Sequence, residues 1–114
     1  MSEPSSERVM VALTTAPSAE VAERIGRSLV EDRLAACANV VAGVTSIFKW
    51  KGSIERESEV LVILKTTDGR MEALERRVVE LHPYEVPEVI AFPVEAGHAP
   101  YLSWVRAEVG GDGA

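Results

Sequence analysis

Two side chains in this sequence have the chemistry of a transition-metal ligand. His82 stands at the start of a proline-rich turn, HPYEVP at 82–87, where an imidazole can be presented to solvent. The competing interpretation is that His82 only ends a helix, where the helix dipole favours a cation. Cys37 is the single cysteine, and its thiolate would suit Cu(I), although its small apolar neighbours favour a buried packing residue. The metal-ligand candidates are therefore His82 and Cys37.

A second group of polar residues suggests a binding cleft. Tyr84, Glu85 and Glu88 follow His82 closely, and Lys65 stands near the end of an apolar run. Together they could line a polar cleft between subunits, in which Lys65 would attract a small anionic metabolite. The alternative is that Glu85 and Glu88 are solvated turn charges.

The motifs of the common catalytic and phosphate-binding sites are absent from the sequence. There is no CxxC pair, no HExxH, no GxSxG and no phosphate-binding glycine-rich loop. Nucleophilic catalysis by a Cys–His pair would require Cys37 to meet His82 or His98 in space. We therefore expect a protein that is not an enzyme.

Length and composition indicate one globular domain spanning residues 1–114, with an ordered core from about 8 to 109 and polar tails. A chain of this size buries roughly 65% of its unfolded surface, so no metal or cofactor is required for folding. The net charge of −6 disfavours nucleic acid and anionic membranes as partners. A single cysteine, with no signal-like segment and no bilayer-spanning apolar run, predicts a cytoplasmic protein.

Hydrophobic periodicity predicts the elements that must position these residues. Alternating or apolar runs predict strands, and apolar residues at helical spacing predict helices. We expect a strand at 9–13, a helix from Ser18 to about Asp32, strands at 35–50 and 54–67, a helix capped by Asp68, a strand at 88–94 and a closing helix at about 100–109. Pro93 should lie at a sheet edge or strand end, because it cannot donate to a ladder. This order is that of an α+β, ferredoxin-like split βαβ fold (βαββαβ plus a C-terminal helix), an antiparallel sheet with helices on one face.

The strands at 9–13 and 60–64 are apolar at every position, or nearly so, and this predicts self-association. Two helices can cover only one sheet face, so the apolar residues of the other face need a neighbouring chain. The large aromatic residues Trp50, Tyr101 and Trp104 suit an intersubunit contact, with packing inside one domain as the competing account.

The two long strands should form a hairpin that overhangs a domain of this size. Arms of 13 to 16 residues would run roughly 43 to 53 Å, against a domain diameter of about 35 Å. The competing interpretation is that Gly43 bends the arm back or marks a bulge. Glu55, Glu57 and Glu59 alternate along one strand face, and we expect a wet face or a guard of the hairpin edge.

Five segments closely resemble the CutA family of divalent-cation tolerance proteins, in the right order and spacing between about residues 9 and 109. They are AACAN at 35–39, SIFKWKGSIE at 46–55, LKTT at 64–67, HPYEVPE at 82–88 and YLSW at 101–104. The resemblance implies a ferredoxin-like subunit in a tight homotrimer similar to PII signalling proteins, with a role in the response to metal ions, copper binding and no enzymatic reaction.

This sequence departs from the family at two positions that bear on a copper site. Some members carry a second histidine directly before the His-Pro pair and a cysteine near the end of the first strand, where this chain has Leu81 and Thr14. The inherited ligand set is therefore incomplete here. Two hypotheses follow: a homotrimeric metal-responsive protein that binds copper or another divalent cation, and alternatively a PII-like trimeric sensor that binds a small anionic metabolite in intersubunit clefts.

Overall fold

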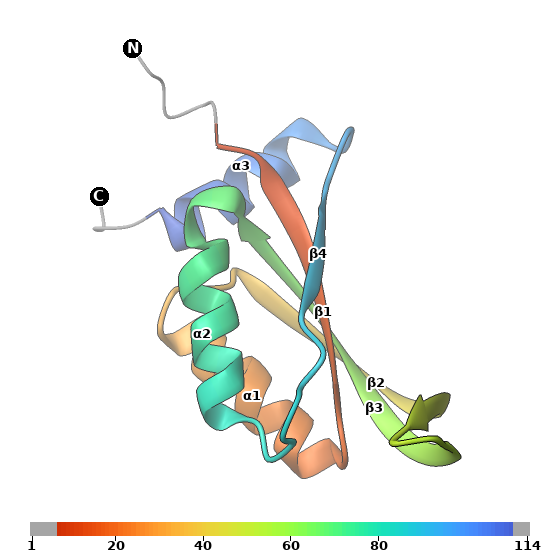
Figure 1. The fold of residues 1–114 in the computed structure, drawn as a ribbon. Helices are drawn as coiled ribbons and strands as arrows, with labels where there is room; N and C mark the ends of the chain where they lie inside the picture. Colours follow the sequence, from red (N-terminus) through yellow and green to blue (C-terminus); the bar gives the residue numbers. More distant parts are fainter. Residues whose placement is uncertain (1–6, 111–114) are drawn as a thin grey trace.

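The computed structural model describes residues 7–110, which form a four-stranded sheet and three helices (Figure 1). The tails at 1–6 and 111–114 lie outside the described residues. In chain order the elements are β1 (Val9–Ala16), α1 (Ala19–Glu31), β2 (Cys37–Trp50), β3 (Ser53–Thr67), the 3₁₀ turn η2 (Asp68–Arg70), α2 (Met71–Leu81), β4 (Ile90–Pro93) and α3 (Ala99–Val109). Within this range, no helix is both long enough and apolar enough to cross a bilayer.

The sheet has the strand order β2-β3-β1-β4 with antiparallel pairing throughout, and α1 and α2 lie on one side of it (Figure 1). This confirms the ferredoxin-like prediction. The main core forms where the two helices meet the sheet, and its largest side chains are Ile25, Leu29, Val62, Leu64, Leu74 and Val78. A smaller cluster joins α3 to the end of the sheet through Val105 and Val109, which pack with Val9.

The two predicted helix caps have different outcomes. Ser18 caps α1 as expected, because its Oγ accepts a 3.2 Å hydrogen bond from the Val21 amide. Asp68 was expected to cap α2, and this prediction is wrong. Its carboxylate accepts a bond from the Arg8 amide instead, and the turn η2 intervenes before α2 begins at Met71. Asp68 therefore ties the start of β1 to the end of β3.

β4 is shorter than expected and lies at the sheet edge. It covers only Ile90–Pro93, and Pro93 is its last residue, as predicted from its missing N–H. The preceding residues, 82–89, form an irregular segment that follows α2. Pro83 and Pro87 keep this segment out of both helix and ladder.

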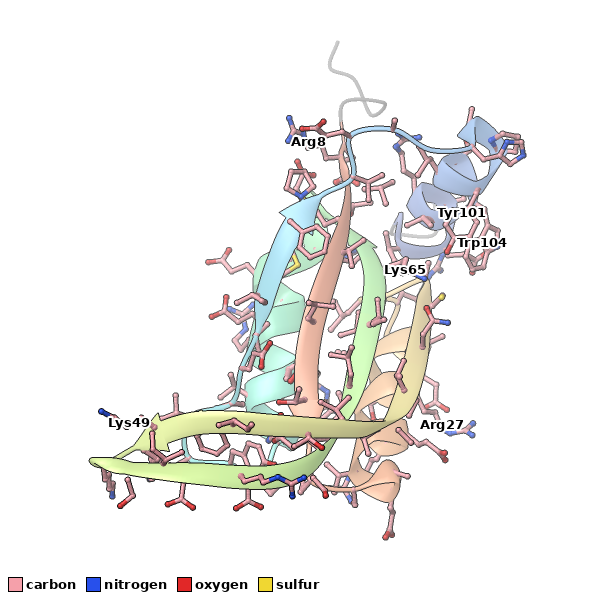
Figure 2. All side chains as sticks on the ribbon, turned by 90° about the vertical axis from the view of Figure 1, so that its right-hand side faces the viewer. Arg8, Arg27, Lys49, Lys65, Tyr101 and Trp104 are labelled. Atoms are coloured by element: carbon pink, nitrogen blue, oxygen red, sulfur yellow. The ribbon has the colours of Figure 1, made fainter. Side chains whose placement is uncertain are left out.

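The sheet face opposite α1 and α2 is apolar, as the strand pattern predicted. Register and alternation place seven apolar side chains on it, which we call the open face: Val11, Leu13, Val41, Leu61, Ile63, Ile90 and Phe92. Ile90 is 53% exposed and Phe92 is 47% exposed, and the central members are half-buried. Figure 2 views this face directly.

The β2–β3 hairpin overhangs the domain, and it is also bent. Residues 53–59 of β3 pair only with β2, and the molecule measures 51 × 25 × 22 Å. Between Val41 and Val44 the register shifts, because two residues of β2 oppose one of β3, and Gly43 there has φ of +86°. The hairpin turns away from the sheet direction and carries Lys49 to its far end (Figure 2). Lys51 and Gly52, both at positive φ, make the two-residue turn.

Candidate functional site

Two adjoining hollows lie between the bent hairpin and the irregular segment 82–89. We call them together the hairpin groove. The larger one, about 570 Å³, is lined by Pro17, Phe48, Trp50, Glu55, Glu57, Glu59, Tyr84, Glu85 and Val86. The smaller, about 410 Å³, shares five of these residues and adds Thr15, Ser46, Ile47 and Glu88. The bulge at Gly43 turns the hairpin toward segment 82–89, and the two prolines hold that segment irregular. The groove therefore depends on both features.

A hydrogen bond between Tyr84 and Glu59 forms the floor of the groove. The Tyr84 hydroxyl donates to Glu59 Oε2 over 2.6 Å, and Glu59 is only 8% exposed. Burial raises the pKa of Tyr84, and the hydrogen bond to Glu59 and the negative charges of Glu59 and Glu57 raise it further. Tyr84 thus remains a protonated donor at neutral pH. The expectation that Glu59 belongs to a wet strand face is wrong, because the bent hairpin folds this position against segment 82–89.

The charge of Glu59 has no basic partner among residues 7–110. In that part of the chain the side-chain ion pairs are those of Arg77 with Asp32 and with Glu80. The groove lining contains five carboxylates and, over the same residues, no lysine, arginine or histidine. The hairpin groove is therefore an acidic site with aromatic walls.

His82 is buried beside this groove. The prediction that its imidazole is presented to solvent is therefore wrong. His82 is 8% exposed, and its Nε2 lies 2.7 Å from the carbonyl oxygen of Thr15. Its Nδ1 accepts a hydrogen bond of 3.2 Å from the Tyr84 amide, and the two rings lie 4.5 Å apart. This pattern makes Nε2 the protonated nitrogen and Nδ1 the acceptor. His82 thereby fastens the end of α2 to β1 and orients Tyr84.

Cys37 lies at the other end of the sheet, in a polar trio on the open-face side. Lys65 Nζ is 2.6 Å from Asn39 Oδ1 and 3.7 Å from Cys37 Sγ. Figure 2 shows Lys65 at the same end of the molecule as Tyr101 and Trp104. Cys37 pairs with Lys65 on β3, whereas Thr15, the partner of His82, pairs with Leu61. Four strand residues, about 13 Å, separate these positions.

The described part of one chain holds no preformed metal site. Over residues 7–110, no group of three or more His, Cys, Asp or Glu residues is arranged to hold a metal ion. The separation of Cys37 from His82 agrees with this result. A metal site that used both residues would therefore need more than one chain.

The four predicted cleft residues divide between two places. Tyr84 and Glu85 line the larger hollow of the groove and Glu88 lines the smaller, and both glutamates are exposed. Lys65 is six β3 residues beyond Glu59, about 20 Å away. Within one chain, Lys65 therefore gives this groove no positive charge for an anionic metabolite.

The three aromatic residues predicted to contact another subunit also lie in two separate places. Trp50 is 41% exposed and lines the groove. Tyr101 and Trp104 lie on α3 with ring centroids 5.6 Å apart, and both are similarly half-exposed. Sequence reasoning missed Phe48 and Glu59 as site residues. The alternation of Glu55, Glu57 and Glu59 was a signal for a shared face, but nothing local pointed to Tyr84, 25 positions later.

Comparison with known protein families and sequences finds relatives that all carry the name CutA or CutA1. The family model described as "CutA1 divalent ion tolerance protein" matches residues 10–108. The divalent-cation tolerance protein CutA of Thermus thermophilus is 48% identical over 100 residues, which are 88% of this chain and 97% of the relative. Protein CutA of Homo sapiens is 53% identical over 98 residues, 86% of this chain but 55% of the relative, so this chain spans about half of its length.

Solved structures show the same likeness. The crystal structure of CutA from Xylella fastidiosa superposes with a TM-score of 0.88 at 38% identity, covering 90% of this chain and 98% of that one. The CutA1 structure from Thermus thermophilus gives a TM-score of 0.86 at 47% identity, covering 88% and 97%. Residues 10–108, which the family model matches, contain all of the sheet except Val9, the helices α1 and α2, and the hairpin groove. This chain therefore belongs to the CutA1 divalent ion tolerance protein family.

Proposed function

We propose that the chain acts in divalent-cation tolerance as a cytoplasmic homotrimer, responding to metal ions by binding copper or another divalent cation, with no catalytic step. The family supports the role in tolerance. The single cysteine supports a reducing compartment. The main structural support for the proposed homotrimer is the apolar open face.

The open face supports self-association because it is apolar across all four strands. Its edge residues Ile90 and Phe92 are about half exposed in a single chain, a costly arrangement in water. Three copies related by a threefold axis would bury this face symmetrically. Light scattering coupled to size exclusion at micromolar concentration should give the mass of three chains. The mass of one chain would contradict the proposal.

We place metal binding where chains meet, because a single chain lacks a three-ligand group over residues 7–110. Cys37 lies on the side that the trimer would bury, so its thiolate is the candidate soft ligand. His82 is the second candidate, and it would have to exchange its bond with the Thr15 carbonyl for the metal. Both roles depend on assembly.

Calorimetric titration with copper tests these ligands one at a time. The variants are Cys37→Ser and His82→Gln, with His98→Gln as the matched control because His98 is exposed on α3's N-terminal side. Loss of affinity in the first two variants, and none in the control, supports the proposal. Unchanged isotherms in both would remove these residues from the site, and circular dichroism checks that each variant is folded.

A further inference from the structure

We propose that the hairpin groove binds a linear organic polycation, a compound with two or more ammonium groups joined by short methylene chains. The proposal is based on an acidic strand face that lies beside three aromatic rings, Phe48, Trp50 and Tyr84, and includes a buried carboxylate. The proposal goes beyond metal tolerance and does not rest on it.

The buried carboxylate of Glu59 is the first reason. A charge taken out of water is costly unless an opposite charge compensates it. Glu59 is more than nine-tenths buried, and its partner is the neutral hydroxyl of Tyr84. Among residues 7–110 no lysine or arginine pairs with it. A bound cation would supply the missing charge.

The spacing of the carboxylates is the second reason, because it selects an extended cation over a single metal ion. Glu55, Glu57 and Glu59 alternate along β3, so successive carboxylates lie about 6.6 Å apart along the strand. A metal ion needs ligands converging within about 2.6 Å, and no such group exists in the described part of the chain. Ammonium groups separated by a four-carbon chain fit carboxylates spread in this way.

The walls of the groove are the third reason. Phe48 and Trp50 are each 41% exposed and line both hollows, where they offer π-faces to a cation. The Lys51 ammonium already lies 5.7 Å from the centroid of the Trp50 ring, so this ring contacts an alkylammonium within its own chain. Pro17 and Val86 provide apolar contact for methylene groups.

The test is calorimetric titration of the metal-free, assembled protein with spermidine, and with Mg²⁺ at matched ionic strength. We expect spermidine to bind and Mg²⁺ not to displace it. Glu57→Gln removes an exposed groove charge without touching the Tyr84 bond, and it should weaken spermidine binding about tenfold. Glu72→Gln, on the first turn of α2 and outside the groove lining, is the matched control and should leave the affinity unchanged.

Trp50 fluorescence gives an independent readout, because a cation on its ring should alter the emission of Trp50 in Trp104→Phe protein. Equal spermidine affinity in Glu57→Gln and Glu72→Gln would overturn the proposal, as would displacement by Mg²⁺ at constant ionic strength. An absence of binding would also overturn it. None of these results bears on copper binding or on trimer mass.

Discussion

The hydroxyl of Tyr84 donates a 2.6 Å hydrogen bond to the carboxylate of Glu59, which joins the segment after α2 to the base of the hairpin. Glu59 lies just where β3 leaves the sheet, one residue before its pairing with β1 begins at Val60. His82 orients Tyr84 through its Nδ1 and is itself held by Thr15. This chain of contacts connects β1, segment 82–89 and the hairpin.

Removal of the Tyr84 hydroxyl should destabilise the protein. Tyr84→Phe leaves the buried carboxylate of Glu59 without its donor, so we expect the free energy of unfolding to fall by about 1–3 kcal/mol. Urea unfolding at one fixed chain concentration measures the change. Tyr101→Phe is the control, because that hydroxyl has no hydrogen bond in the described residues and the side chain is 40% exposed. Equal losses in both variants would contradict the role of the bond.

Alkaline pH should weaken the folded state through the same residue. The pKa of Tyr84 is raised above its ordinary 10.0, so the folded protein keeps a proton that the unfolded chain loses. The stabilising contribution is complete below about pH 10 and falls as pH rises through the folded-state pKa. Above about pH 10, wild type should therefore lose more stability with rising pH than Tyr84→Phe. Parallel melting curves for the two proteins would contradict this prediction.

A charge on the open face should prevent assembly. Phe92→Lys introduces an ammonium at an edge position that is 47% exposed in one chain, and burying it in an interface would leave it unpaired. We expect light scattering to report a mass below that of three chains. Val79→Lys is the control, since Val79 is 50% exposed on α2, away from the open face. If the Phe92→Lys variant still has the mass of three chains, the subunit interface does not include this edge of the open face.

Replacement of Gly43 should cost stability through the backbone alone. A Cβ at this position would meet no atom within 4 Å, yet φ is +86°, where L-residues are strained. Gly43→Ala should lower the free energy of unfolding by about 1–2 kcal/mol. Gly43→Asn should lose less, because asparagine tolerates positive φ better. If urea unfolding shows no difference between alanine and wild type, the bulge conformation is not required.

Periodic patterns predicted the architecture because they follow from burial. Ile25 and Leu29 recur at helical spacing since one face of α1 meets the sheet, and Ser18 precedes the first turn as a cap should. Asp68 has the same local chemistry as Ser18. It does not cap α2, because the Arg8 amide from the start of β1 takes its carboxylate.

The groove was less predictable because its contacts are distant in the chain. Nothing near His82 shows that its partner is the carbonyl of Thr15, 67 positions earlier. Glu59 has the same alternation as Glu55 and Glu57, yet it alone of the three is buried, because the hairpin bends there. Alternation in the local sequence predicts which residues share a strand face. It does not predict the direction in which a bulge turns that face.

The bulge at Gly43 affects the direction of the hairpin without affecting the pairing of its strands at the tip. Val44 still opposes Glu59 and Trp50 still opposes Ser53, so pairing at the tip is regular beyond the extra residue. Deleting that residue would restore a continuous ladder and keep every one of these pairs, while the arm would lose its bend. A relative differing by one residue here could therefore retain the same hairpin and lack the hollow beneath it. The length of β2 between Val41 and Val44 is thus the place to look when members of this family differ in what they bind.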